Sequence, residues 1–411
     1  MAIDVAAVRR SFPILDRELD GHRLVYLDSA ASSLTPEPVL DAMDRYYRWS
    51  RSNVNRGIYP LAEEATDLYE GARTTLAGFL DADPVGVVFT KNATEACNLL
   101  AYGFVRAHLG PDDVLLSTVM EHHANLVPFT QAAAAVGAEV RHVPITPDGL
   151  LDLDAAAELL ADGRVTFAAF VHVSNVLGTI NDVERLTRMV KDANDRAIVH
   201  VDGAQAAPHL PVSFRDLGID SYAITGHKML GPTGIGALVA RPELLERMEP
   251  FLTGGDMIRD VTLTGATWND VPHRFEAGTP MIAEAAGLAA AVGVLEGYGM
   301  AAVRSHERDL TAQLLDALGT VAGVTVHGPK DVDLRGGAVS FALDGIHPHD
   351  VGAMLGSRGV CVRVGHHCTK PLMRCLDVAA TTRASSYVYN DVDDLEPLVD
   401  GLEAAAAFFA R

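Results

Sequence analysis

The chain has 411 residues, and its 33 Lys and Arg residues are outnumbered by 54 Asp and Glu residues, giving a formal net charge of −21. Nucleic acids and anionic membranes are bound largely through surplus Lys and Arg, so neither is expected as a main partner. With 48% hydrophobic and 21% charged residues, the composition is that of a globular protein and excludes a disordered one.

The four cysteines are too few for a disulfide framework in a chain of this length, so a reducing compartment is expected. The first twenty residues contain no apolar stretch long enough for a signal peptide. No apolar run approaches the roughly 20 residues needed to span a bilayer. We therefore expect a soluble, cytoplasmic protein.

Between about residues 85 and 240, short apolar runs alternate with amphipathic stretches. The runs are rich in β-branched residues and almost continuously apolar, which is typical of strands buried on both faces of a parallel or mixed sheet. The predicted strands are 85–89, 114–119, 138–143, 165–173, 197–201, 221–225 and 235–240. Helices are expected over 94–107, 153–161 and 182–194, and this alternation favours an α/β sheet covered on both faces.

The pattern changes after about residue 300. A connecting helix is expected near 284–297, and a long helix over 301–318. Short strand-like segments then alternate with further helices, the strands at 324–328, 336–343 and 360–365 and the helices at 349–357 and 393–409. We predict a large domain over 20–298 and a smaller α+β domain formed by 299–411 together with 1–19.

Polar residues follow five of the predicted strands, at the edge where open α/β sheets place their active sites. They are Asn92-Ala93-Thr94, His122-His123, Asn175, Asp202 with Gln205, and Gly226-His227-Lys228. Each group also has an ordinary structural explanation. The 92–94 segment fits a helix N-cap as well as a phosphate-binding helix start, and an Asp at a strand end is often a turn residue.

Lysine is scarce, with five in the chain, so few residues could form a Schiff base. Lys191 lies on a polar helix face and Lys330 in a Gly-Pro turn, and both are expected to be solvated. Lys228 instead follows a strand and is flanked by glycines that allow close approach of a cofactor. Together with Asp202 at another strand end, it fits a pyridoxal phosphate enzyme, in which the lysine forms the Schiff base and the Asp pairs with the pyridinium nitrogen.

Cys368 lies in the Gly- and His-rich segment 363–371, beside cationic residues that favour a nucleophilic thiolate. The other cysteines, Cys97, Cys361 and Cys375, are expected to be packed or incidental. A metal site at residues 366–368 is disfavoured because adjacent residues seldom converge on one ion.

Several longer motifs occur in one order along the chain: Glu121-His-His-Ala-Asn, His172-Val-Ser-Asn-Val-Leu-Gly-Thr, Val201-Asp-Gly-Ala-Gln, Gly226-His-Lys, Phe275-Glu-Ala-Gly-Thr-Pro and Arg363-Val-Gly-His-His-Cys. With these motifs the chain resembles the class V aminotransferase family of fold-type I pyridoxal phosphate enzymes, and within it the SufS-like (group II) cysteine desulfurases. The resemblance covers essentially the whole chain. It implies an aspartate-aminotransferase-like α/β fold with a seven-stranded mixed sheet and a smaller α+β C-terminal domain.

The resemblance implies a cofactor site for pyridoxal 5'-phosphate. Its residues would be Ala93, Thr94, His122, Asn175, Asp202, Gln205, Thr225, His227, Lys228 and Thr279. In it, Lys228 forms the Schiff base, Asp202 pairs with the pyridine nitrogen and Gln205 bonds the phenolic oxygen. His122 stacks on the ring and assists proton transfer, and Thr279 reaches the neighbouring subunit's cofactor in a homodimer.

The resemblance also implies the substrate and the reaction. Asn175, Arg363 and Arg383 would hold the carboxylate of L-cysteine, or of L-selenocysteine, and Cys368 would be the nucleophile. The reaction would give L-alanine and a persulfide on Cys368, whose sulfur passes to an acceptor protein for iron–sulfur cluster assembly or other thio-transfer. Two positions depart from the family pattern: Ala93, where a hydroxyl residue is common, and Thr369-Lys370 after the nucleophile.

Three alternatives remain from the sequence. One is another class V activity on the same scaffold: a selenocysteine lyase, a C–S lyase, or an aminotransferase- or epimerase-like enzyme of a specialised pathway. A more distant one is a non-catalytic metal- or sulfur-carrying protein built on residues 366–368. A nicotinamide dehydrogenase is disfavoured because no G-x-G-x-x-G motif follows a predicted strand.

Overall fold

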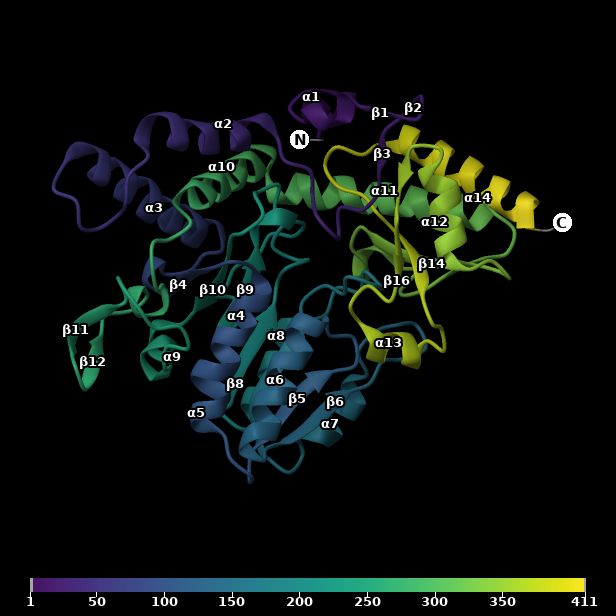
Figure 1. The fold of residues 1–411 in the computed structure, drawn as a ribbon. Helices are drawn as coiled ribbons and strands as arrows, with labels where there is room; N and C mark the ends of the chain where they lie inside the picture. The colour runs from purple at the N-terminus through teal and green to yellow at the C-terminus, as the bar shows by residue number, and fades with distance from the viewer. Residues whose placement is uncertain (1–2, 410–411) are drawn as a thin grey trace.

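The computed structural model describes residues 3–409, and its main feature is a sheet of seven strands (Figure 1). In spatial order these are β4 (Val87–Thr90), β10 (Gly236–Ala240), β9 (Ser221–Thr225), β8 (Ile198–Asp202), β7 (Val165–Val171), β5 (Val114–Thr118) and β6 (Glu139–Val143). β10 runs antiparallel to both its neighbours, whereas the remaining pairs are parallel. The predicted mixed sheet and its seven strands are therefore confirmed, with ends shifted by one or two residues.

Helices cover both faces of this sheet, which explains why its strands are apolar along their whole length. α4 (Ala93–Leu100) and α6 (His123–Val136) pack on one face, where Cys97 and Phe129 are buried. The other face is covered by α3 (Pro60–Phe79), α7 (Leu153–Leu160), α8 (Val183–Ala193) and α10 (Ile282–Tyr298). The helix predicted over 94–107 is α4, which continues through a wide turn at 101–105 into α5 (Arg106–His108).

The prediction that Lys191 is solvated is wrong. Its Nζ donates to the carboxylate of Asp220 at 2.7 Å and to the carbonyl of Ala197, and the side chain is only 28% exposed. Asp220 also accepts from the Val199 N–H, so the lysine neutralises a carboxylate that joins the amino ends of the central strands β8 and β9. Amphipathic spacing could not reveal a partner that lies on another element.

The C-terminal part forms a second, antiparallel sheet in the order β13 (Val324–Val326), β14 (Ala338–Leu343), β17 (Thr381–Ser385) and β16 (Arg363–Gly365). α11 (Met300–Thr320), α12 (Pro348–Gly356) and α14 (Leu395–Phe409) share a core with it that includes Leu310, Phe341 and Leu398. β17 is not predicted from the sequence, because its residues, Thr-Thr-Arg-Ala-Ser, lack a strand-like apolar pattern although all five are buried.

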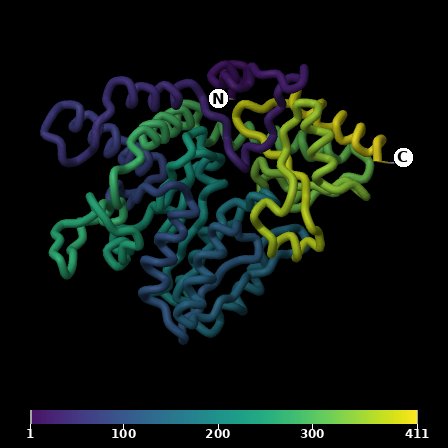
Figure 2. Tube along the Cα trace, in the orientation of Figure 1, coloured from purple at the N-terminus to yellow at the C-terminus, as the bar shows by residue number. Residues whose placement is uncertain are grey.

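The N-terminal segment lies against the C-terminal part of the chain (Figure 2). β3 (Val25–Tyr26) pairs in parallel with β15 (Val360–Cys361), and Asp28 bridges to Ser385. The domain limits 20–298 and 1–19 plus 299–411 stay a prediction.

The remaining α-helices and strands lie outside the two sheets and the helices named with them. They are α1 (Val5–Arg9), β1 (Glu18–Leu19), β2 (His22–Arg23), α2 (Glu37–Arg45), α9 (Pro242–Arg247), the hairpin of β11 (Ile258–Thr262) and β12 (Gly265–Trp268), and α13 (Lys370–Cys375). Within residues 3–409, no single helix has both the length and the apolar composition to cross a membrane; only α10 and α11 taken together, as a bent pair, meet that test.

Candidate active site

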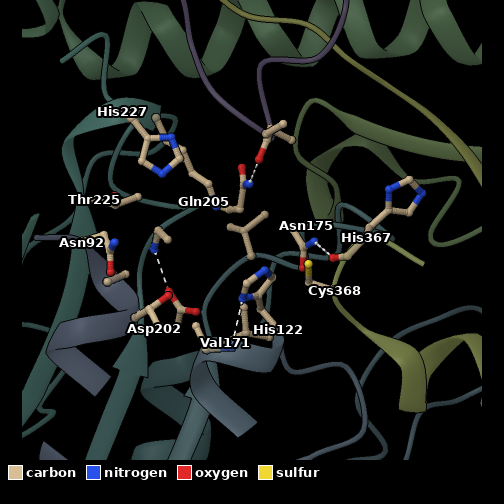
Figure 3. A pocket seen from close by; sticks show the side chains of 18 of the residues that line it. Asn92, His122, Val171, Asn175, Asp202, Gln205, Thr225, His227, His367 and Cys368 are labelled. Atoms are coloured by element: carbon tan, nitrogen blue, oxygen red, sulfur yellow. Dashed lines mark hydrogen bonds between the residues drawn. The ribbon is translucent and has the colours of Figure 1, made fainter. Parts of the chain in front are cut away.

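A cavity of about 190 Å³ lies where the carboxyl ends of the large sheet face the C-terminal sheet (Figure 3). Five strands of the large sheet, β4, β5, β7, β8 and β9, deliver residues to it through the segments that follow them, and β16 and β17 contribute from the other side. The predicted site residues among its lining are Ala93, Thr94, His122, Asn175, Asp202, Gln205, Thr225, His227, Lys228, Arg363, Cys368 and Arg383. The structure thus brings together every predicted site residue except Thr279.

Lys228 ends a short helical turn, Gly226–Lys228, directly after β9. Burial lowers the pKa of its amine to about 8, and nearby Arg383 and Arg363 act in the same direction, while Asp202 opposes them. An amine with this pKa is neutral in part of its population near neutral pH, as a nucleophile or proton acceptor must be. Gly226 permits the turn, since a Cβ there would lie 2.9 Å from the Ile235 side chain.

Asp202 ends β8 and is buried. One carboxylate oxygen accepts the Ala204 N–H at 3.0 Å. Burial raises the pKa of this carboxyl group, whereas the Ala204 N–H and Lys228 lower it. A buried carboxylate beside an amine can hold a cationic ring nitrogen, which a solvated one would do more weakly.

The first turn of α4 forms the anion-binding end of the cavity. Asn92 caps the helix by accepting the Glu95 N–H at 3.0 Å. The N–H groups of Ala93 and Thr94 come first in the helix and so have no acceptor within it. The hydroxyl of Thr225 is buried, lines the same cavity, and has no hydrogen-bond partner among the described residues. These donors fit a phosphate, as helix N-termini commonly do.

His122 caps α6, and its Nδ1 accepts the Ala124 N–H at 3.1 Å, which leaves the ring proton on Nε2. Burial lowers the pKa of this imidazole to about 3, and Lys228 and His123 add to the effect. The ring is therefore neutral over the working pH range. A neutral ring can lie against an aromatic cofactor without desolvating a charge.

Gln205 and Asn175 present amides to the cavity (Figure 3). Gln205 donates its Nε2 to the Ala30 carbonyl at 2.6 Å, and Asn175 donates its Nδ2 to the His367 carbonyl at 2.8 Å. The Oδ1 of Asn175 is buried and, in the described part of the chain, unpartnered. Such an oxygen costs stability unless a bound group donates to it.

Arg383, on β17, is almost completely buried and held by two different segments. It donates to the Asn175 carbonyl at 2.9 Å and to the carboxylate of Asp28 at 3.0 Å. Its Nε is buried with no acceptor in residues 3–409, so the guanidinium keeps donor capacity for an anion. Arg363 lies exposed on β16 at the rim of the same cavity.

Cys368 lies on the loop between β16 and α13, half-buried at the cavity wall. His367 and Cys368 both adopt left-handed backbone conformations, with φ of +49° and +58°. Such conformations are unfavourable for residues other than glycine and are common at functional sites. The thiol therefore shares one cavity with Lys228 and Arg383 although the three residues come from distant parts of the sequence.

Thr279 lies elsewhere. It is exposed and lines a separate depression with Tyr69, Phe89 and Phe251. Within this chain it does not contact the Lys228 cavity, and a role there would need a second subunit.

Some residues that line or support the site are not among those predicted from the sequence. Asp28 orients Arg383, and His367 lines the cavity beside Cys368. Asp28 follows the apolar run at residues 24–27, so it carries the same signal as Asp202, a carboxylate directly after a strand-like run. In residues 3–409 no group of three or more His, Cys, Asp or Glu residues is arranged to hold a metal ion.

Residues 25–398 match the sequence model of the family described as aminotransferase class V. The chain therefore belongs to the class V aminotransferase family, as its motifs predict. Among its relatives, a probable cysteine desulfurase of Halobacterium salinarum is 50% identical over 99% of this chain and 98% of that protein. A cysteine desulfurase of Haloferax volcanii is 46% identical over 99% and 98% of the two chains.

A solved structure supports the same fold. The apo structure of a cysteine desulfurase from Thermococcus onnurineus superimposes with a TM-score of 0.93 at 38% identity, covering 99% of each chain. The predicted fold class is thus confirmed over almost the whole molecule.

Proposed function

We propose that the chain is a pyridoxal 5'-phosphate-dependent cysteine desulfurase, which converts L-cysteine to L-alanine and leaves a persulfide on Cys368. The observation that carries the proposal is the presence of Cys368, Lys228 and Arg383 in one cavity. Lysine supplies the attachment point for a cofactor aldehyde, arginine binds an amino-acid carboxylate, and cysteine supplies a thiol that can attack sulfur. The names of the relatives agree with this assignment.

The lining residues fit the cofactor. The first turn of α4, the unpartnered hydroxyl of Thr225, and His227 would hold its phosphate. Asp202 would pair with the ring nitrogen, Gln205 would donate to the phenolic oxygen, and His122 would lie against the ring. Once bound, pyridoxal phosphate acts as an electron sink that makes the Cα proton of an attached amino acid acidic.

The side chains then have separate tasks. Arg383 and Arg363, with the second Nδ2 hydrogen of Asn175, hold the substrate carboxylate and so fix the orientation of the amino acid. The Lys228 amine, when it is not bound to the cofactor, accepts the Cα proton of the substrate and transfers it. Cys368 attacks the substrate sulfur, so that an S–S bond forms as the C–S bond breaks. Cysteine plus the Cys368 thiol gives alanine plus a Cys368 persulfide, and the step needs no external oxidant or reductant.

The other class V activities, including selenocysteine lyase, C–S lyase and aminotransferase- or epimerase-like enzymes, would use the same cofactor residues. Of the residues in the cavity, Cys368 favours desulfuration among these activities, because a transamination has no step for a thiol nucleophile.

Replacement of the nucleophile tests the proposal. In Cys368→Ala, formation of alanine from L-cysteine should fall by roughly two orders of magnitude or more, because the group that accepts the sulfur is absent. The visible cofactor band and its response to L-cysteine should persist. Cys375→Ala, which changes an exposed cysteine on the same segment, is the matched control and should retain activity. Equal rates in wild type and Cys368→Ala would rule out the persulfide route.

We also propose that the enzyme works as a cytoplasmic homodimer that passes its sulfur to an acceptor protein, for iron–sulfur cluster assembly or other thio-transfer. All four cysteines are free, which suits a reducing compartment. The position of Thr279 on an outer face supports a shared site, in which it reaches the neighbouring subunit's cofactor. The half-buried Cys368 is accessible enough for an acceptor thiol.

A further inference from the structure

Two histidines outside the cavity hold the backbone of the nucleophile loop. The backbone N–H of His123 donates to the Cys368 carbonyl at 2.8 Å, and the ring Nε2 of His123 accepts the Lys370 N–H at 3.1 Å. The Nδ1 of His366 accepts the Cys368 N–H at 3.1 Å. The two rings lie side by side, with centroids 5.7 Å apart.

This loop needs partners outside itself. His367 and Cys368 are left-handed at adjacent positions, and neither is glycine, so the isolated segment would relax toward negative φ. Such a change at Cys368 would redirect its thiol away from the cavity wall. The contacts from α6 through His123 hold the C-terminal side of this strained pair, one at Cys368 itself and one at Lys370, the first residue of α13.

We propose that His123 is a positioning residue for the nucleophile: by accepting the Lys370 N–H, it keeps Cys368 in the conformation that points its thiol into the cavity. The proposal rests on the desulfurase function proposed above and assigns a role to a second histidine beside His122. His123 must be neutral, with its proton on Nδ1, because in a protonated ring Nε2 also carries a hydrogen and cannot accept the Lys370 N–H.

The surroundings of His123 agree with a neutral ring. Burial lowers the pKa of His123, and the neighbouring His366 and Lys370 act in the same direction. The contact with residue 370 uses the backbone N–H, which every residue except proline supplies. The departure from the family pattern at Lys370 therefore leaves this contact intact, and the lysine side chain remains exposed.

Two substitutions separate the ring's hydrogen bond from its bulk. His123→Phe keeps an aromatic ring but removes the acceptor, whereas His123→Gln supplies an oxygen at about the reach of Nε2. His108→Phe is the matched control, since His108 also bonds a backbone group through Nε2, at the Arg247 carbonyl far from the cavity. The measurements are hydrogen–deuterium exchange of residues 366–370, the rate of Cys368 alkylation by iodoacetamide, and kcat and KM for L-cysteine, all on the holoenzyme.

In His123→Phe, exchange at the Lys370 amide should accelerate about tenfold, which is the size expected for one lost hydrogen bond. The alkylation rate of Cys368 should change and kcat should fall by roughly tenfold while KM stays within about twofold, since the carboxylate-binding arginines are untouched. His123→Gln should restore the exchange rate, the alkylation rate and kcat, and His108→Phe should match wild type in all three.

Unchanged exchange and alkylation in His123→Phe, or a Gln variant that behaves like Phe, would overturn the proposal. Exchange and alkylation do not depend on turnover. They would still decide the role of His123 if wild type formed no alanine, a result that would refute the desulfurase function separately.

Discussion

At the scale of single residues, enclosure sets the protonation states of the cavity. Burial raises the pKa of Asp202 and lowers those of Lys228 and His122. In each case the protein interior disfavours the charged form. Asp202 and Lys228 also oppose each other's shift, because the charge on each stabilises the charged form of the other. His122 has no opposing carboxylate of this kind among the causes of its shift, and its pKa falls to about 3.

The pKa of Lys228 predicts how capture of the cofactor by the apoenzyme depends on pH. Covalent capture needs the neutral amine, whose fraction rises about tenfold per pH unit below a pKa near 8 and levels off above it. The rate of appearance of the visible cofactor band after mixing with pyridoxal 5'-phosphate should follow this curve. Pyridoxine 5'-phosphate, which lacks the aldehyde, should bind without this dependence. A rate that is flat or falls with rising pH would contradict the assignment.

At the scale of elements, a buried ion pair connects α3 to the segment that carries Thr279. Arg73 donates to both carboxylate oxygens of Glu276, at 2.7 and 2.9 Å, and Glu276 also accepts from Tyr69 and from the Phe89 N–H. This network joins α3, β4 and the 276–280 segment. It holds Thr279 on the outer face where the proposed second subunit would meet it.

Arg73→Leu should lower the free energy of unfolding by about 3–5 kcal/mol, because it leaves the carboxylate of Glu276 buried without its cation. Arg188→Leu breaks an exposed pair with Glu184 on α8 and should cost about 0–1 kcal/mol. Urea unfolding of both variants measures the difference. Equal losses in the two variants would show that the Arg73 pair adds no more than a surface pair.

At the scale of the whole molecule, an unusual set of apolar side chains is exposed between α2 and α3. Tyr47, Trp49, Ile58 and Tyr59 are each at least half exposed, and Ile58 is 98% exposed. Exposed apolar patches commonly mark protein–protein contacts. We propose that this surface belongs to the homodimer interface, which would also bring Thr279 to its partner's cavity.

Ile58→Glu should weaken the dimer, because it places a charge in an apolar interface. Size-exclusion chromatography at low micromolar concentration should then show a shift toward monomer. Phe408→Glu, at an exposed apolar position on α14, is the control and should elute as wild type. A wild-type enzyme that elutes as an active monomer would refute the dimer itself.

The sequence by itself determined the sheet and most of the site. The strands of the large sheet are buried on both faces, so their apolar runs are distinct from their surroundings, and residues such as Asp202 and Lys228 are recognisable by their position after a strand. Lysine scarcity added weight to Lys228, since only five lysines in the chain could form a Schiff base. Among the described residues, the structure places Lys228 and no other lysine in the lining of the cavity.

Only the tertiary structure decided which distant residues meet. β17 was not predicted because most of its buried side chains are polar. Arg383 is held in place by hydrogen bonds to Asp28 and Asn175, which lie 355 and 208 residues away along the chain. The conformation of the Cys368 loop depends on His123, which lies 245 positions earlier in the chain. The two segments meet because α6 packs beside the loop. Periodicity and motif spacing report on local backbone and burial, whereas a hydrogen bond between separate elements exists only once both have packed.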